Sequence, residues 1–137
     1  MLLTHPKRQP EEVSGALMLD ADRCWSKGSP RTSPDGAMLG GFHKENRWMK
    51  VLAAGDSDDI SLARCLSGLI KQLSPAQGYL QQFVADGGSV EFGVMWRIGS
   101  LWPQETFKPK LLGQLAEMQI KLSISTVMAD SSEPDRQ

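Results

Sequence analysis

Alternation of apolar and polar residues is clearest in the second half of the chain. From Ser89 to Ile98 every second residue is apolar, which is the period of a strand with one buried face. The same alternation returns from Ile120 to Met128. A less regular stretch from Asn46 to Ala53 is also predicted to be a strand, and Ala21 to Lys27 to be extended. Before them only Met1 to Thr4 forms a candidate first strand, and it is short.

Apolar residues spaced three and four apart predict the helices. The strongest pattern starts at Asp56 or Ser57 and runs to Leu73. Ser74-Pro75-Ala76-Gln77 is then expected to act as a capping box for a shorter helix, which Asp86-Gly87-Gly88 ends. Two further helices, each opened by a proline at its first position, are predicted from Pro10 to Leu19 and from Pro109 to Gln119.

The order of these elements indicates the fold class. Several strands follow one another without a helix between them, so we predict an α+β domain whose largely antiparallel sheet has helices packed on one face. A ferredoxin-like arrangement fits this order. Turn-forming residues between Arg31 and Gly41 predict a loop there, and Gly99 to Phe107 is predicted to be a loop or a short returning strand. We expect one domain over residues 1–128 and a flexible C-terminal tail over residues 129–137.

Composition and charge narrow the class of protein. The chain has 137 residues, of which 40% are hydrophobic and 23% charged, as in soluble globular domains. Its formal net charge of -1 gives no overall basic field, so neither nucleic acid nor an anionic membrane is an expected partner. No apolar run approaches the roughly 20 residues of a membrane helix, and the N-terminus lacks the apolar centre of a signal peptide. We therefore expect a cytoplasmic protein.

Residues that could carry catalysis or bind a metal are not grouped in sequence. The histidines and cysteines lack the close paired spacings of structural zinc sites; the four residues are His5, His43, Cys24 and Cys65. We expect the histidines at the surface, with His5 in a mobile terminus, and the two thiols reduced and buried. No nucleophile elbow or phosphate-binding loop is present. The acidic pairs Glu11-Glu12 and Asp58-Asp59 stand at predicted helix starts, where the helix dipole favours them. We predict no catalytic residue, metal or cofactor.

Two short segments combine tryptophan with cations. One runs from Arg23 to Arg31 and the other from Lys44 to Trp48. If they pair as neighbouring strands, a candidate binding group would converge, since cations stacked on indole suit an anionic ligand or an acidic peptide; its residues are Trp25, Lys27, Arg31, Arg47 and Trp48. The plainer alternative makes both tryptophans core or rim residues with cationic stems packed over them, and burial is the commoner role of tryptophan.

Several of these segments also recur together as the landmarks of one family. They are Pro10-Glu11-Glu12-Val13 leading to Leu19, Arg23-Cys24-Trp25-Ser26-Lys27-Gly28, Lys44-Glu45-Asn46-Arg47-Trp48, Leu69-Ile70-Lys71-Gln72-Leu73-Ser74-Pro75, and the run from Phe107 through Leu111-Leu112 to Leu122-Ser123-Ile124. In order and spacing, over residues 2–128, the chain resembles the bacterial family called domain of unknown function 4279. The resemblance implies a fold and no activity. The chain departs from the family in its short first strand and in the aromatic stretch from Trp96 to Trp102.

Three hypotheses for function follow. The first is a non-enzymatic protein that recognises another macromolecule, in an accessory role that includes the immunity type. The second is a domain that binds a small anionic ligand, or a minor enzyme, with a pocket between sheet and helices that is lined by Trp25, Trp48 and Trp96 and anchored by Arg31 and Arg47. The third is an oligomeric scaffold, which would need a large exposed apolar face.

Overall fold

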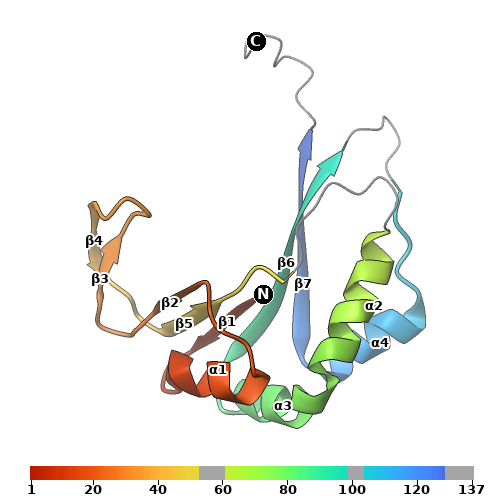
Figure 1. The fold of residues 1–137 in the computed structure, drawn as a ribbon, viewed down its shortest axis with the longest axis horizontal. Coiled ribbons are helices and arrows are strands. Elements are labelled where there is room, and N and C mark those ends of the chain that lie inside the picture. Colours follow the sequence, from red (N-terminus) through yellow and green to blue (C-terminus); the bar gives the residue numbers. More distant parts are fainter. Residues whose placement is uncertain (53–60, 99–103, 129–137) are drawn as a thin grey trace.

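The computed structural model describes residues 1–52, 61–98 and 104–128. Figure 1 shows the elements in chain order: β1 (Leu2–His5), α1 (Pro10–Leu17), β2 (Arg23–Trp25), β3 (Pro30–Thr32), β4 (Met38–Phe42), β5 (Asn46–Met49), α2 (Leu62–Leu73), the 3-10 turn η1 (Ser74–Ala76), α3 (Gln77–Ala85), β6 (Ser89–Ile98), α4 (Pro109–Glu117) and β7 (Ile120–Met128). The predicted tail, residues 129–137, lies outside the described residues.

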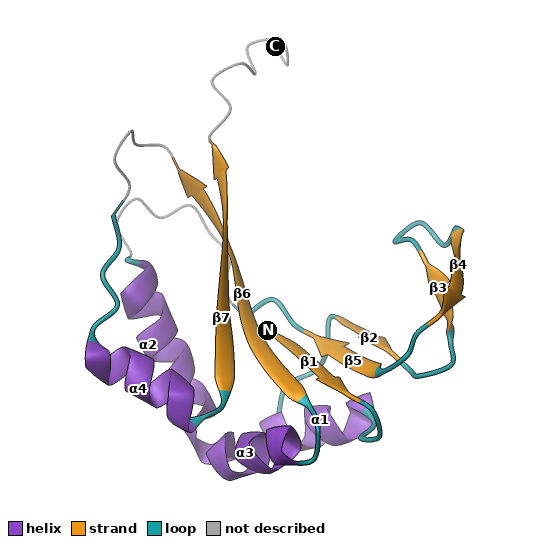
Figure 2. Cartoon of the chain, turned by 180° about the vertical axis from the view of Figure 1, so that it is seen from behind, coloured by secondary structure: helices purple, strands orange, loops and turns teal. Residues whose placement is uncertain are grey.

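A sheet of five strands organises the chain, in the order β2-β5-β1-β6-β7. Every neighbouring pair is antiparallel except β6 and β7, which run parallel from Val90 opposite Ile120 to Ile98 opposite Met128. The helices gather on one side of it, with α1 against β5, α3 against β6 and α4 against β7 (Figure 2). The predicted α+β class, with a mostly antiparallel sheet, is confirmed.

The strand order differs from a ferredoxin-like sheet at β6 and β7. In that arrangement a third strand lies between the two strands that a crossover helix joins. Here α4 joins β6 to β7, and the two strands are direct neighbours. The other edge of β6 is already paired with β1, so β7 takes the outer edge.

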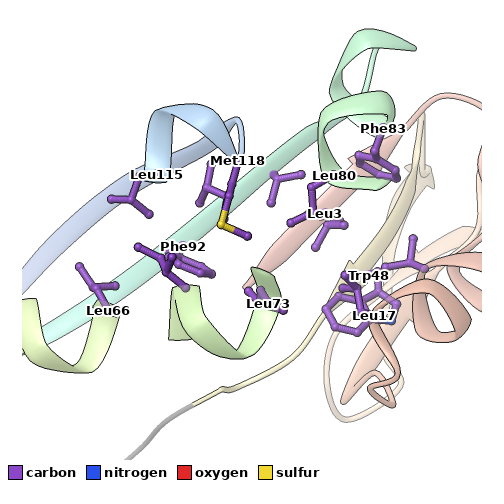
Figure 3. Packing of buried hydrophobic residues seen from close by; sticks show 14 of the residues in the cluster. Leu3, Leu17, Trp48, Leu66, Leu73, Leu80, Phe83, Phe92, Leu115 and Met118 are labelled. Carbon is purple, nitrogen blue, oxygen red and sulfur yellow. The ribbon is translucent and has the colours of Figure 1, made fainter. Parts of the chain in front are cut away.

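Strand register decides which side chains face the helices. Leu3 lies opposite both Trp48 on β5 and Val90 on β6, and Val90 lies opposite Ile120 on β7. All four are buried, and they pack with helix residues in one core (Figure 3), whose remaining members are Val13, Leu17, Leu66, Ile70, Leu73, Leu80, Phe83, Phe92, Leu111, Leu115 and Met118. Because side chains alternate along a strand, the residues between them point to the opposite face.

The first strand is more important than its length suggests. The prediction placed a short strand over Met1 to Thr4 and His5 in a mobile terminus, but β1 is the middle strand of the sheet. It pairs with β5 on one side and β6 on the other. His5 is therefore buried, with 2% of its surface exposed, and its predicted place at the surface is wrong.

The predicted loop from Arg31 to Gly41 is instead a hairpin of β3 and β4, which forms a separate two-stranded sheet. The turn is closed by the N–H of Ser33, which donates to the carbonyl oxygen of Ala37 at 2.8 Å. Every side chain of β4 is exposed. A strand that buries neither face leaves no alternation in the sequence, so only the turn residues gave a signal there.

The junctions of α2 also differ from the prediction. Its described N-terminus is capped by Ser61, whose hydroxyl accepts from the N–H of Arg64 at 3.1 Å, and the predicted start at Asp56 or Ser57 lies outside the described residues. The predicted capping box does not form, because the hydroxyl of Ser74 donates back to the carbonyl oxygen of Lys71 at 3.0 Å. The chain passes from α2 to α3 through a 3-10 turn instead.

Candidate functional site

A hollow of about 450 Å³ lies where the β3–β4 hairpin stands beside β2 and β5. Its wall on the sheet comes from Arg23 and Trp25 of β2 and Arg47 of β5. Arg31, Leu39 and Phe42 of the hairpin line the other side, and residues 43–45 connect the two. The hollow therefore belongs to the face of the sheet that points away from the four helices.

Register brings the residues of the sheet wall together. Trp25 lies directly opposite Arg47 in the antiparallel pair of β2 and β5, and Arg23 is the next residue of β2 on the same face. Side chains opposite or diagonal on one face of such a pair lie within contact range. The guanidinium of Arg23 is 4.8 Å from the centre of the Trp25 indole, a cation–π contact. The same indole lies near the His43 ring, with ring centres 5.9 Å apart.

The hairpin wall combines one arginine with exposed apolar side chains. The side chain of Arg31 packs against Gly41 of β4, since its Cδ lies 3.9 Å from the position that a Cβ of Gly41 would take. Gly40 and Gly41 both have positive φ, 82° and 74°, which glycine adopts without strain. Beside them Leu39 and Phe42 keep 56% and 66% of their surfaces exposed. The hairpin thus offers apolar surface next to a cation.

Hydrogen bonds around Asn46 fix the base of the hairpin relative to the sheet. The amide oxygen of buried Asn46 accepts from the N–H of Lys27 at 2.7 Å, and its amide nitrogen donates to the carbonyl oxygen of Arg8 at 3.0 Å. Next to it, Gly28 and Ser29 exchange backbone hydrogen bonds with His43 at 2.8 and 2.9 Å. These bonds hold the start and end of the hairpin together and therefore fix the position of the hairpin wall relative to the sheet wall.

The hollow is cationic. Four of its lining side chains are basic and one is acidic: Arg23, Arg31, Lys44 and Arg47 against Glu45. Over residues 1–52, 61–98 and 104–128, the ion pairs are those of Arg8 with Glu12 and Asp86 and of Lys50 with Asp22, and none involves a cation of the hollow. Such a group attracts an anion, and the single carboxylate does not neutralise it.

The structure divides the five residues predicted to bind a ligand or partner. Trp25, Arg31 and Arg47 line the hollow, whereas the exposed side chain of Lys27 is not part of the lining. Trp48 does not join them, because Cys24 and not Trp25 is its partner across β2 and β5. It is 1% exposed, and its indole N–H donates to the Ser14 hydroxyl at 2.9 Å.

The hollow lies on the face of the sheet opposite the helices, whereas Trp48, predicted to line a pocket between sheet and helices, is packed in the core on the helix side. Arg23, Leu39, Phe42 and His43 were missed. Arg23 had a signal, since a residue two positions from Trp25 in a strand shares its face. The hairpin residues had none, because their segment showed no strand pattern.

His5 has a structural role in the turn after β1. Its Nδ1 accepts hydrogen bonds from the N–H groups of Lys7 and Arg8, both at 2.9 Å. Burial, together with the nearby Arg8 guanidinium, lowers the pKa of His5. Both effects favour the neutral ring. The hydrogen bonds require the same state, because a protonated Nδ1 could not accept them. His5 therefore caps this turn as a neutral acceptor.

A polar cluster ties the same turn to α3. Arg8 pairs with Asp86 and Glu12, and the hydroxyl of Tyr79 donates to Glu12 at 2.8 Å. The hydrogen bond from Arg8 lowers the pKa of Asp86, while burial and then the bond to Glu12 raise the pKa of Tyr79 to about 12. Every charge of the cluster has a partner, so we assign it to stability and not to ligand binding.

Other chemistry is sparse in the part of the chain that the structure describes. There, no three His, Cys, Asp or Glu side chains stand close enough together to hold a metal ion. The thiols of Cys24 and Cys65 are free, the first exposed and the second half-buried, so the predicted burial of Cys24 is wrong: it lies on β2, a strand at the edge of the sheet. No helix of the described ranges is long and apolar enough to cross a membrane.

Comparison with known proteins identifies a family. The family described as "Domain of unknown function (DUF4279)" matches residues 2–129, which include β1, the whole of the hollow and β7. No curated protein and no solved structure matches the chain. The family match covers nearly the whole sequence and agrees with the resemblance of its landmark segments: the chain belongs to the DUF4279 family.

Proposed function

We propose that this protein is a non-catalytic recognition domain that binds an acidic segment of a partner protein in the hollow between the β3–β4 hairpin and strands β2 and β5. One observation carries the proposal. Four basic side chains line the hollow against one carboxylate, and the basic residues have no acidic partner within the described ranges. A protein chain with a net charge of -1 concentrates these cations in one concave place.

The apolar surface beside the cations supports a peptide as the ligand. Phe42 and Leu39 are more than half exposed, and Trp25 is half-buried in the wall. Aromatic and arginine side chains are the residues most often found at the energetic centre of protein interfaces. A partner segment with acidic and apolar side chains would satisfy both kinds of surface at once. An accessory protein, of the immunity type or another, would use such a surface in the cytoplasm, where exposed Cys24 stays reduced.

A small free anion is the second candidate for the same hollow. Its volume, about 450 Å³, lies in the range of small-molecule sites. Such sites usually enclose most of the ligand. The exposed Leu39 and Phe42 instead extend the hollow outward along β4, which favours a longer ligand.

Fluorescence polarisation with two labelled probe peptides tests the proposal. One probe is a peptide of glutamate and phenylalanine, and the other replaces every glutamate by lysine. We expect the acidic probe to bind and the basic probe not to bind. Citrate and inorganic phosphate, added as competitors, report the second candidate: displacement at concentrations near the probe's own dissociation constant would favour a small free anion.

Two matched variants locate the binding. Arg47→Glu reverses a charge in the hollow, and Arg64→Glu makes the same change on an exposed position of α2, on the helix side of the sheet. We expect Arg47→Glu to weaken the acidic probe by about tenfold or more, because like charges across an interface repel. Arg64→Glu should bind as the wild type does. Equal affinity of the two variants, or equal binding of both probes, would overturn the proposal.

A further inference from the structure

We infer that the group recognised in this hollow is a phosphorylated side chain, phosphoserine or phosphothreonine, of the partner segment. The inference rests on the proposed function and narrows it from an acidic segment to a phosphate monoester. It follows from the kind of cation in the hollow, from how the cations are held, and from what surrounds them.

Three of the four cations are arginines, and they come from three strands: Arg23 from β2, Arg31 from β3 and Arg47 from β5. The guanidinium group is a planar fork of N–H donors that matches two oxygens of a phosphate, whereas lysine acts as a point charge. A phosphate monoester carries nearly two charges and three terminal oxygens, so it can accept from more than one arginine at once. A single carboxylate has one charge and two oxygens, and would leave part of this donor set unused.

The arginines are available and partly oriented. Within the described ranges, no hydrogen bond or ion pair occupies the guanidinium groups of Arg23, Arg31 or Arg47. The Arg23 guanidinium rests over the Trp25 indole at 4.8 Å. That contact uses the face of the guanidinium and leaves the N–H groups at its edge free to donate. Arg31 is likewise placed, because its stem lies against Gly41 of the neighbouring strand.

The surroundings favour a peptide over the other common carriers of phosphate. Asp35 stands with Ser33 in the turn at the end of the hairpin. Its negative charge would repel an anionic membrane that approached the hollow from this end. A nucleic acid extends well beyond one hollow, and the rest of this chain is acidic, since the whole carries -1 although the hollow is basic. Phe42 and Leu39 instead offer apolar contacts to the residues next to a phosphorylated side chain.

Three degenerate peptide libraries test the inference without knowledge of the partner. They have random flanking residues and share one format, with phosphoserine and phosphothreonine, glutamate, or unmodified serine and threonine fixed at the centre. We expect immobilised wild-type protein to retain the phosphorylated library at least about tenfold over the glutamate library, because a phosphate monoester offers the arginines a larger charge and a third oxygen. Inorganic phosphate and vesicles of phosphatidylserine with phosphatidylinositol phosphate are the comparison arms.

Variants that keep the charge but remove the fork make the test specific. Arg47→Lys and Arg23→Lys should reduce retention of the phosphorylated library by about tenfold and retention of the glutamate library by a smaller factor, because fewer oxygens of a carboxylate depend on the fork. Arg64→Lys on α2 is the matched control and should change neither.

The other possible outcomes separate the phosphate inference from the proposed function. Equal retention of phosphorylated and glutamate libraries would overturn the phosphate inference and leave the proposed function standing. Retention of no library would overturn both. Binding of the vesicles without the peptides, or of inorganic phosphate as tightly as the phosphorylated library, would likewise replace the peptide by a lipid or a free anion.

Discussion

Trp25 and Trp48 lie on opposite faces of the sheet, although they come from neighbouring strands. Trp48 is packed in the core with its N–H bonded to Ser14, while Trp25 is half-buried in the basic hollow beneath Arg23. The same residue type therefore serves stability in one place and, in our proposal, recognition in the other. One residue of register separates the two roles, because neighbouring residues of a strand point to opposite faces.

Alanine substitutions should separate these roles. Trp48→Ala removes a buried side chain and should lower the free energy of unfolding by about 3–5 kcal/mol. Trp25→Ala should lower it by about 1 kcal/mol or less and weaken the acidic probe, since it removes the surface on which Arg23 rests. Chemical denaturation and the polarisation assay measure the two effects. A loss of stability as large for Trp25→Ala as for Trp48→Ala would contradict this division.

His5 should make the protein less stable in mild acid. Folding lowers its pKa below the ordinary 6.5, so below that pH the unfolded chain binds a proton that the folded protein resists. The contribution of His5 is complete above pH 6.5 and decreases as the pH falls toward the pKa of the folded state, by at most about 1.4 kcal/mol per pH unit.

The variant His5→Asn isolates this effect, because an asparagine oxygen accepts backbone N–H groups without titrating. Urea unfolding of both proteins at pH 7.5 and pH 5.5 gives the comparison. The wild type should lose more stability than His5→Asn between these two conditions. If both lose the same amount, proton uptake by His5 has no part in the acid sensitivity.

Gly88 lies in the short connection between α3 and β6, where buried side chains approach the backbone very closely. A Cβ at this position would lie 2.6 Å from two ring carbons of Phe83 and 2.7 Å from Cδ2 of His5, and both side chains are buried. Gly88→Ala should therefore cost about 1–3 kcal/mol through overpacking. Gly113→Ala in α4, where an added Cβ would meet no atom within 4 Å other than those of its own helix turn and chain neighbours, should instead stabilise by up to about 1 kcal/mol. Thermal unfolding of the two variants should show shifts of opposite sign, and two losses of similar size would contradict the predicted clash.

The β3–β4 hairpin should be dispensable for folding and necessary for binding. None of its residues is part of the buried core, and the N–H of His43 donates to the carbonyl oxygen of Ser29 at its base. Replacing residues 30–42 by Asn-Gly, a pair that closes a tight turn, should change the melting temperature by less than about 4 °C. The variant should no longer bind the acidic probe. Retained binding would place recognition elsewhere on the molecule.

Most of the sheet and its helices could be predicted from sequence, for a physical reason. β6, α2, α4 and the start of β7 bury one face against the core, so their apolar residues repeat with the period of the element; farther along β7, Ile124 keeps the alternation although it is exposed. The position of β1 could be predicted, but its place in the middle of the sheet could not, because the sequence of a four-residue strand does not show whether one or both of its edges are paired.

The site could be predicted only in part. The tryptophan–cation pattern located Trp25, Arg31 and Arg47, and the pairing of the two segments as β2 and β5 is observed. Knowing that the two segments pair does not give their register. In the observed register Trp48 lies opposite Cys24 and not Trp25, and its side chain points into the core. The hairpin wall depends on exposed residues such as Phe42, which follow no burial pattern.

The whole molecule separates a packed side from an open side. Helices cover one face of the sheet (Figure 1), and the buried core lies between them and the sheet. The hollow with its excess of cations lies on the other face. Since the chain as a whole is slightly acidic, the basic field is local to this hollow, where we propose that an anionic partner binds. Recognition of an acidic segment at this place is the central claim.

The indole N–H signals in a ¹H–¹⁵N spectrum test this claim most directly, because the chain holds four tryptophans and two of them are assigned opposite places. Trp25 and Trp48 are first identified by single substitution to phenylalanine, and the acidic probe peptide is then added. We predict that the Trp25 signal shifts with saturation while the Trp48 signal stays in place. A Trp25 signal that does not move when the probe binds, or moves no more than that of Trp48, would contradict the account.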